Sequence, residues 1–120
     1  MARVMLVGLT TSTANQIRRA LSGERHEIET RQNCTDVKDL LRADIVFADG
    51  SQAACLPLLR GIRQERPSLP FVVVTMRLET SGWLDAIEAG ATDYCAAPLE
   101  TRQIAWAMES ALRKPKALAA

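Results

Sequence analysis

The sequence predicts one α/β domain in three layers, α/β/α, built on a doubly wound parallel sheet of five strands with five helices. Three observations lead to this prediction. Short runs of consecutive apolar residues alternate with longer segments of helical periodicity. The chain has 120 residues, which is about the length of one domain. It contains 48% hydrophobic and 24% charged residues, a balance that is typical of globular proteins.

The apolar runs predict the strands. Their residues are apolar consecutively instead of alternately, and this suits strands that are covered on both faces. The strands expected are Val4–Val7, Ile45–Ala48, Phe71–Val74 and Tyr94–Ala97, with a weaker candidate at His26–Thr30.

Five amphipathic segments predict the helices. Their expected bounds are Thr13–Leu21, Thr35–Leu41, Ala53–Glu65, Thr80–Ala89 and Glu100–Arg113. Right-handed crossovers between parallel strands then place helices on both faces of the sheet. We expect one domain over residues 1–120, with a core at about 3–113 and a frayed tail over 114–120.

Local signals mark several helix ends and faces. Asn33 or Thr35 is a candidate cap of the second helix, and Gly50-Ser51 is expected to form a turn and cap the third. Gly90 stands where the fourth helix should end. The apolar stripes expected to face the core include Leu84 and Ile87 in the fourth helix, and Ile104, Met108 and Leu112 in the fifth.

Composition excludes several classes of function. Fifteen basic and fourteen acidic residues give a net charge of +1, which offers no electrostatic footprint for nucleic acid or an anionic membrane. No apolar stretch is long enough to span a bilayer. The wide spacing of three cysteines and the presence of only one histidine predict neither a zinc site nor a disulfide framework, and free thiols suggest the cytoplasm. These residues are Cys34, Cys55, Cys95 and His26.

In a doubly wound sheet, ligands and chemistry gather at the carboxyl ends of the strands. The segment Gly8–Thr11, after the first strand, lacks the glycines and the lysine of a phosphate-binding loop. Asp49 follows the third strand and is the sole carboxylate among the strand ends. Thr75 follows the fourth strand, and Pro98, preceded by two alanines, follows the fifth.

The string Ala89–Tyr94, followed at a fixed distance by Pro98, resembles the receiver domain of bacterial two-component response regulators. The resemblance extends from Val4 to Arg113 and implies a flavodoxin-like fold and a role in phosphorelay signal transduction. It implies that Asp49 is the phospho-acceptor, that Thr75 contacts the phosphoryl oxygens, and that Tyr94 is an aromatic switch.

The sequence departs from that family at the charged positions. Gly8 and Leu9 stand where the family has an acidic pair that holds Mg²⁺, and Ala97 stands where it has a lysine. Because phosphoryl transfer depends on positioning and charge neutralisation, we expect a pseudo-receiver with weak or no Mg²⁺ binding, no cofactor and no enzymatic activity. The alternative is a receiver still phosphorylated at Asp49, and Arg77 is a weak candidate to replace the missing charge.

The resemblance also implies an output face, formed by the helix at Thr80–Ala89, the strand that follows it and the last helix. Trp83 and Trp106 lie off the predicted core stripes of the two helices, and tryptophan is enriched at binding hot spots. The expected partner is a histidine kinase or an output protein, and a homodimer through this face is a further option.

Two functions of other classes are weaker. An enzyme using Cys95 or Asp49 as nucleophile lacks a base within sequence reach, since His26 falls outside the strand ends; a depressed pKa of the Cys95 thiol would favour it. We expect no direct contact with nucleic acid. Arg18, Arg19 and Arg25 are expected to form solvated surface.

Overall fold

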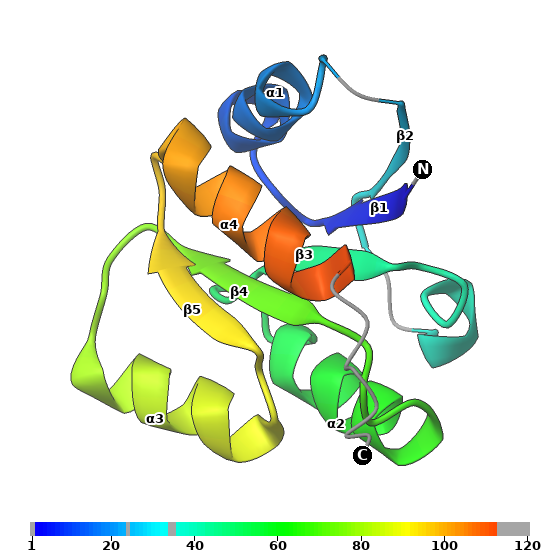
Figure 1. The fold of residues 1–120 in the computed structure, drawn as a ribbon. Coiled ribbons are helices and arrows are strands. Elements are labelled where there is room, and N and C mark those ends of the chain that lie inside the picture. The colour runs from blue at the N-terminus through cyan, green and yellow to red at the C-terminus, as the bar shows by residue number, and fades with distance from the viewer. Residues whose placement is uncertain (1, 24, 34–35, 113–120) are drawn as a thin grey trace, which may run out of the picture.

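A parallel sheet of five strands lies between two layers of helices in the computed structural model, which describes residues 2–23, 25–33 and 36–112 (Figure 1). The strand order is β2-β1-β3-β4-β5, and every neighbouring pair is parallel. The strands are β1 (Ala2–Val7), β2 (His26–Arg31), β3 (Ile45–Asp49), β4 (Phe71–Thr75) and β5 (Asp93–Ala96). The predicted doubly wound α/β sheet is therefore confirmed, with small shifts at the strand ends.

Burial explains which strands are central. Residues Val4–Val7 of β1, Ile45–Ala48 of β3 and Phe71–Val74 of β4 are buried, as predicted from their uninterrupted apolar sequences. The edge strand β2 is mostly exposed and accordingly carries charged residues. The other edge strand, β5, is half-buried along its whole length, so it is not covered on both faces as expected.

Two helices cover each face of the sheet. On one face α1 (Thr11–Ala20) and α4 (Thr101–Leu112) enclose a core that includes Leu6, Ile17 and Ile104. On the other face, α2 (Cys55–Glu65) and α3 (Thr80–Ala89) enclose a second core with the large side chains of Leu59, Ile62 and Phe71. Figure 1 shows the pairs on either side of β3 and β4.

The second predicted helix is wrong. In place of a helix at Thr35–Leu41 the structure has a short 3-10 helix, η1 (Val37–Asp39), so the described residues form four α-helices instead of five. The Asp36 side chain caps η1 by accepting a hydrogen bond from the Lys38 amide at 2.9 Å. A segment this short gains too few backbone bonds to sustain an α-helix. Thr35 and Cys34 lie outside the described residues, as does the expected tail at 114–120.

Helix α3 faces the opposite way from the prediction. Leu84 and Ile87 are 48% and 42% exposed, while Ala86 and Ala89 are buried. The helix packs through its small residues, so its large apolar residues face outward. Gly90 does end the helix as predicted, with a φ of 102°.

Two arginines near the C-terminal end of α2 bind main-chain carbonyls of neighbouring loops. Arg63 donates to the Leu69 and Gly90 carbonyls at 2.7 Å each and to Thr92 Oγ1 at 3.4 Å. Arg66 donates to the carbonyls of Leu41 and Ala43 at 2.8 and 2.6 Å. Burial lowers the pKa of the Arg63 guanidinium, which shows that desolvation offsets part of what these bonds contribute.

In the described part of the chain, the helices are all too short or too polar to cross a membrane.

Candidate functional site at the strand ends

The carboxyl ends of β1, β3, β4 and β5 meet at one rim of the sheet. The register pairs Val7 with Ala48, Asp49 with Val74, and Thr75 with Ala96. The loops that follow these strands therefore lie together, as the sequence predicted from the topology of a doubly wound sheet.

Asp49 is partly exposed at the end of β3. Its Oδ1 atom accepts hydrogen bonds from the Ser51 amide and the Ser51 hydroxyl, both at 2.8 Å. The expectation that Gly50-Ser51 caps the next helix is wrong, because Ser51 turns back to Asp49 and α2 begins at Cys55 without a side-chain cap. Among the described residues, the other carboxylate oxygen of Asp49, Oδ2, has no hydrogen bond.

The space beside Gly8 is occupied by a glutamine. Gly8 has a φ of 69°, and a Cβ atom placed there would lie 2.6 Å from the side-chain amide of Gln52. The Gln52 Nε2 atom donates to the Gly8 carbonyl at 3.4 Å. Sequence reasoning missed this contact, because the two residues are 44 positions apart and neither carries a local signal for the other.

Thr75 and Tyr94 come together at one carbonyl. The Thr75 hydroxyl donates to the Arg77 carbonyl at 3.1 Å and accepts from the Arg77 amide at 3.4 Å. The Tyr94 hydroxyl donates to the same carbonyl over a longer distance of 3.5 Å. Thr75 is thus turned into its own loop, Tyr94 is half-buried, and Arg77 is exposed.

The end of β5 is held by backbone contacts and carries no charge. The Ala97 amide donates to the Thr75 carbonyl at 2.7 Å, and the Ala97–Pro98 peptide bond is cis. The Leu99 amide donates to Gln16 Oε1 at 3.1 Å, which ties this loop to α1. Leu9, at the end of β1, packs partly into the core between α1 and α4.

The donor set at this rim does not fit a divalent cation that requires several carboxylates. Asp49 is the one carboxylate at the strand ends, and Gly8 and Leu9 offer only backbone carbonyls. Within the described ranges, no three His, Cys, Asp or Glu side chains come together in a group that could hold a metal ion.

The condition that would favour Cys95 as a nucleophile, a depressed pKa of its thiol, is not met. Burial raises the pKa of both the Cys55 and the Cys95 thiols to about 11, with smaller contributions from Asp49 and Asp93 respectively. Each thiol is therefore protonated near neutral pH, the opposite of an activated nucleophile. His26 Nδ1 accepts a hydrogen bond from the Ala2 amide at 3.2 Å, which ties the start of β2 to the start of β1.

Comparison with known proteins shows similarity to response regulators. No protein-family model matches the chain. The response regulator MprA of a Mycobacterium species is 27% identical to this chain over 117 residues. The match covers 93% of this chain and 51% of MprA. The alginate biosynthesis transcriptional regulatory protein AlgB of Pseudomonas putida is 29% identical, covering 95% of this chain and 30% of its own length. A response regulator from Thermotoga maritima has the same fold, with a TM-score of 0.81, 23% identity, and coverage of 93% and 98% of the two chains.

Over most of its length the chain is similar to response regulators. It spans about half the length of the MprA relatives, or less in the case of AlgB. The predicted flavodoxin-like fold is confirmed, and the predicted resemblance to two-component receivers is supported by these relatives.

Both tryptophans of the chain lie outside its core. Trp83 on α3 is 48% exposed, and Trp106 on α4 is 60% exposed. They belong to helices that cover opposite faces of the sheet, on either side of the edge strand β5.

Proposed function

We propose that this receiver is a pseudo-receiver, which transmits signals through protein contacts and not through Mg²⁺-dependent phosphorylation of Asp49. Its partner would be a histidine kinase or an output protein. The observation that carries the proposal is the uncharged set around Asp49: Gly8 packs against Gln52, Leu9 packs toward the core, and Ala97 presents a methyl group.

Chemistry supports this interpretation. Transfer of a phosphoryl group to a carboxylate brings negative charges together, and a protein accelerates it chiefly by positioning and by neutralising those charges. A preorganised electrostatic contact of this kind is worth about 3 kcal/mol. The absence of two acidic side chains and one ammonium group from these positions would therefore slow the reaction by several powers of ten, although such losses are not additive. Mg²⁺ binding would be weak for the same reason.

One observation favours a second candidate, a receiver that is still phosphorylated at Asp49. The side chain is partly exposed, and both of its hydrogen bonds to Ser51 use Oδ1. The Oδ2 atom thus remains available to attack a phosphodonor that brings its own charge compensation.

Intact-mass spectrometry after incubation with acetyl phosphate, with and without Mg²⁺, separates the two candidates. The wild-type chain is expected to gain no phosphoryl group under conditions that modify an ordinary receiver. An adduct that requires Mg²⁺ and disappears in Asp49→Asn would refute the pseudo-receiver. The variant Gly8→Asp/Leu9→Asp/Gln52→Ala/Ala97→Lys restores the missing charges and removes the side chain that fills the space beside Gly8, and we expect it to gain an Asp49-dependent adduct.

A further inference from the structure

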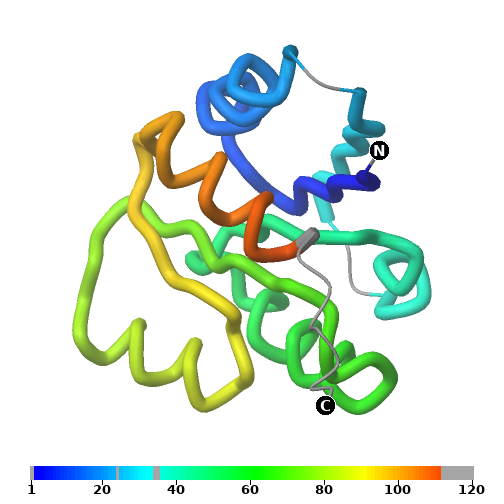
Figure 2. Tube along the Cα trace, viewed as in Figure 1, coloured from blue at the N-terminus to red at the C-terminus, as the bar shows by residue number. Residues whose placement is uncertain are grey.

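A row of large apolar side chains is exposed along α3 and the loop before it. Met76 and Leu78 in the loop are 67% and 64% exposed, and Trp83, Leu84 and Ile87 on the helix are 42–48% exposed. We call these five residues the α3 stripe. Figure 2 shows the loop running outward along the side of the molecule from β4 to α3.

The helical part of the stripe is continuous because of how α3 packs. At 100° per residue, Trp83, Ile87 and Leu84 fall within one sector of the helix, while Gly82, Ala86 and Ala89 fall on the side that faces the protein. Gly82 lies so close to the Tyr94 hydroxyl that a Cβ there would be 2.6 Å from it. Small residues thus bring the helix close to the sheet and leave the large ones facing outward.

A shallow groove of about 470 Å³ lies at the N-terminal end of the stripe. It is lined by Leu78, Glu79, Thr80, Trp83 and Tyr94, so its walls are mainly apolar and aromatic. Contiguous exposed apolar surface of this kind marks interaction sites on monomeric proteins. A groove beside an exposed helix suits a helical segment with apolar residues on one side.

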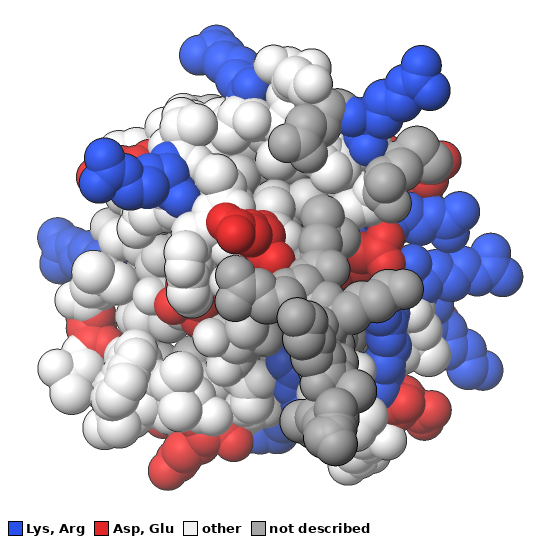
Figure 3. Space-filling view, viewed as in Figure 1, with Lys and Arg blue, Asp and Glu red and all other residues white. Residues whose placement is uncertain are grey.

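The charge around the stripe is negative. Residues 76–90 contain three acidic side chains, Glu79, Asp85 and Glu88, and one basic side chain, Arg77, whereas the whole chain has fifteen basic and fourteen acidic residues. Asp85 and Glu88 follow each other along one margin of the stripe on the helix surface. In Figure 3 the lower-left face, where α3 lies, is largely uncharged, with acidic residues and adjoining basic atoms at its lower margin.

We infer that the α3 stripe binds a partner through an amphipathic helix whose apolar face is bordered by lysine or arginine residues. This inference rests on the proposed function, because it names the chemistry of the partner that a pseudo-receiver would contact. Apolar burial over Trp83 supplies the affinity, and the acidic margin selects a basic segment and fixes its orientation.

A second copy of this chain fits the stripe less well. A symmetric dimer uses the same patch on both subunits, so Asp85 and Glu88 would face acidic residues of the other copy. Like charges at an interface oppose association. The charge on α3 therefore argues against the homodimer considered from the sequence and for a heterologous, basic partner.

Tryptophan fluorescence can test this inference directly. The chain has two tryptophans, so Trp106→Phe leaves Trp83 as the only one. The probes are two designed peptides of about five helical turns, one with leucine and lysine and one with leucine and glutamate at the same positions. We expect the basic peptide to shift the emission of Trp83, and this shift should saturate as the peptide concentration is raised. The basic peptide should bind at least tenfold more tightly than the acidic peptide, and this preference should fall as the salt concentration is raised.

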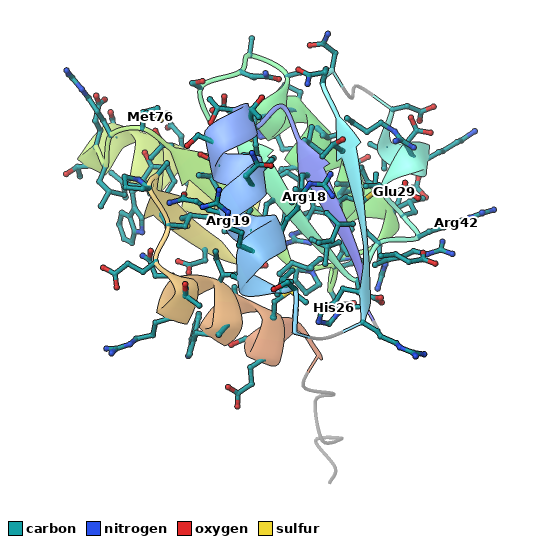
Figure 4. The ribbon with its side chains drawn as sticks, turned by 90° about the horizontal axis from the view of Figure 1, so that it is seen from above. Arg18, Arg19, His26, Glu29, Arg42 and Met76 are labelled. Carbon is teal, nitrogen blue, oxygen red and sulfur yellow. The ribbon has the colours of Figure 1, made fainter. Side chains whose placement is uncertain are left out.

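Variants separate the two parts of the site. Leu84→Ser/Ile87→Ser should weaken binding of the basic peptide about tenfold or more. Asp85→Asn/Glu88→Gln should remove most of the preference for the basic peptide. Glu29→Gln is the matched control, since Glu29 lies on β2 on the other side of the molecule from Met76 (Figure 4). Circular dichroism of each variant verifies that the fold is kept.

Three results would overturn the inference: equal affinity for the two peptides, unchanged binding in Leu84→Ser/Ile87→Ser, or self-association of the wild-type chain through this face in sedimentation experiments. The outcome is independent of the phosphodonor experiment. If the chain does not bind the basic peptide and takes no phosphoryl group, the inference about the partner fails and the pseudo-receiver proposal stands. If the chain binds the basic peptide and is also phosphorylated at Asp49, the pseudo-receiver proposal fails and the α3 stripe remains a binding site.

Discussion

The guanidinium of Arg63 is expected to contribute more to stability than any exposed charge on α2. It donates two short hydrogen bonds, to the carbonyls of Leu69 and Gly90, and a longer one to Thr92. A hydrogen bond to a charged group is worth about 1.5–3 kcal/mol. Because the guanidinium is partly exposed, we take the low end of that range for each short bond and expect Arg63→Ala to lower the free energy of unfolding by about 3 kcal/mol.

Urea denaturation measures this difference. The midpoint urea concentration should fall, while the slope of the free energy of unfolding against urea concentration should stay unchanged. Arg60→Ala is the matched control, since Arg60 is exposed on the same helix, one turn earlier, and should change stability by no more than about 0.5 kcal/mol. Arg63→Lys should recover part of the loss, because an ammonium group can reach one of the carbonyls. Equal midpoints for Arg63→Ala and Arg60→Ala would refute the reasoning.

Two further predictions follow from the same structure. Gly90→Ala should lower the free energy of unfolding by about 1–2 kcal/mol in urea denaturation, because a Cβ at a φ of 102° is strained and would lie 2.9 Å from the Arg63 side chain. Gly23→Ala is the control and should leave the stability unchanged, because the space around Gly23 is open. In the variant Cys34→Ser, Cys55 and Cys95 should react slowly with a thiol reagent at pH 8 in the folded protein and rapidly in urea. Their pKa values of about 11 exceed the value of about 8.5 for an unfolded thiol, so stability should fall as the pH rises from about 9 toward 11; a flat profile would contradict the assigned burial.

The sheet was predictable because its signal is local. Val4–Val7, Ile45–Ala48 and Phe71–Val74 are uninterrupted apolar runs, and a strand covered on both faces needs that composition. Gly90 was equally readable, since the end of a helix in a left-handed conformation favours glycine. The positions of Asp49 and Thr75 at strand ends follow from the same pattern.

What the sequence did not show depends on contacts between distant segments. Periodicity groups Leu84 with Ile87, but it does not say which side of α3 meets the sheet; the close approach at Gly82 decides that. The contact of Gln52 with Gly8 and the bonds of Arg63 to distant carbonyls have no local signature either. Details of the candidate site were therefore hidden, although its location was not.

The two ends of the strands are fixed by different means. At the end where β3 and β4 begin, Arg63 and Arg66 reach from α2 to carbonyls in three separate connections. At the opposite rim, Asp49 and Thr75 are held mainly by residues two positions away. Local opening should accordingly be easier at the rim than at the base, and amide hydrogen exchange should be faster there. Residues in the loops at the rim can therefore be replaced with little loss of stability, because the interactions that maintain the sheet are concentrated at its other end.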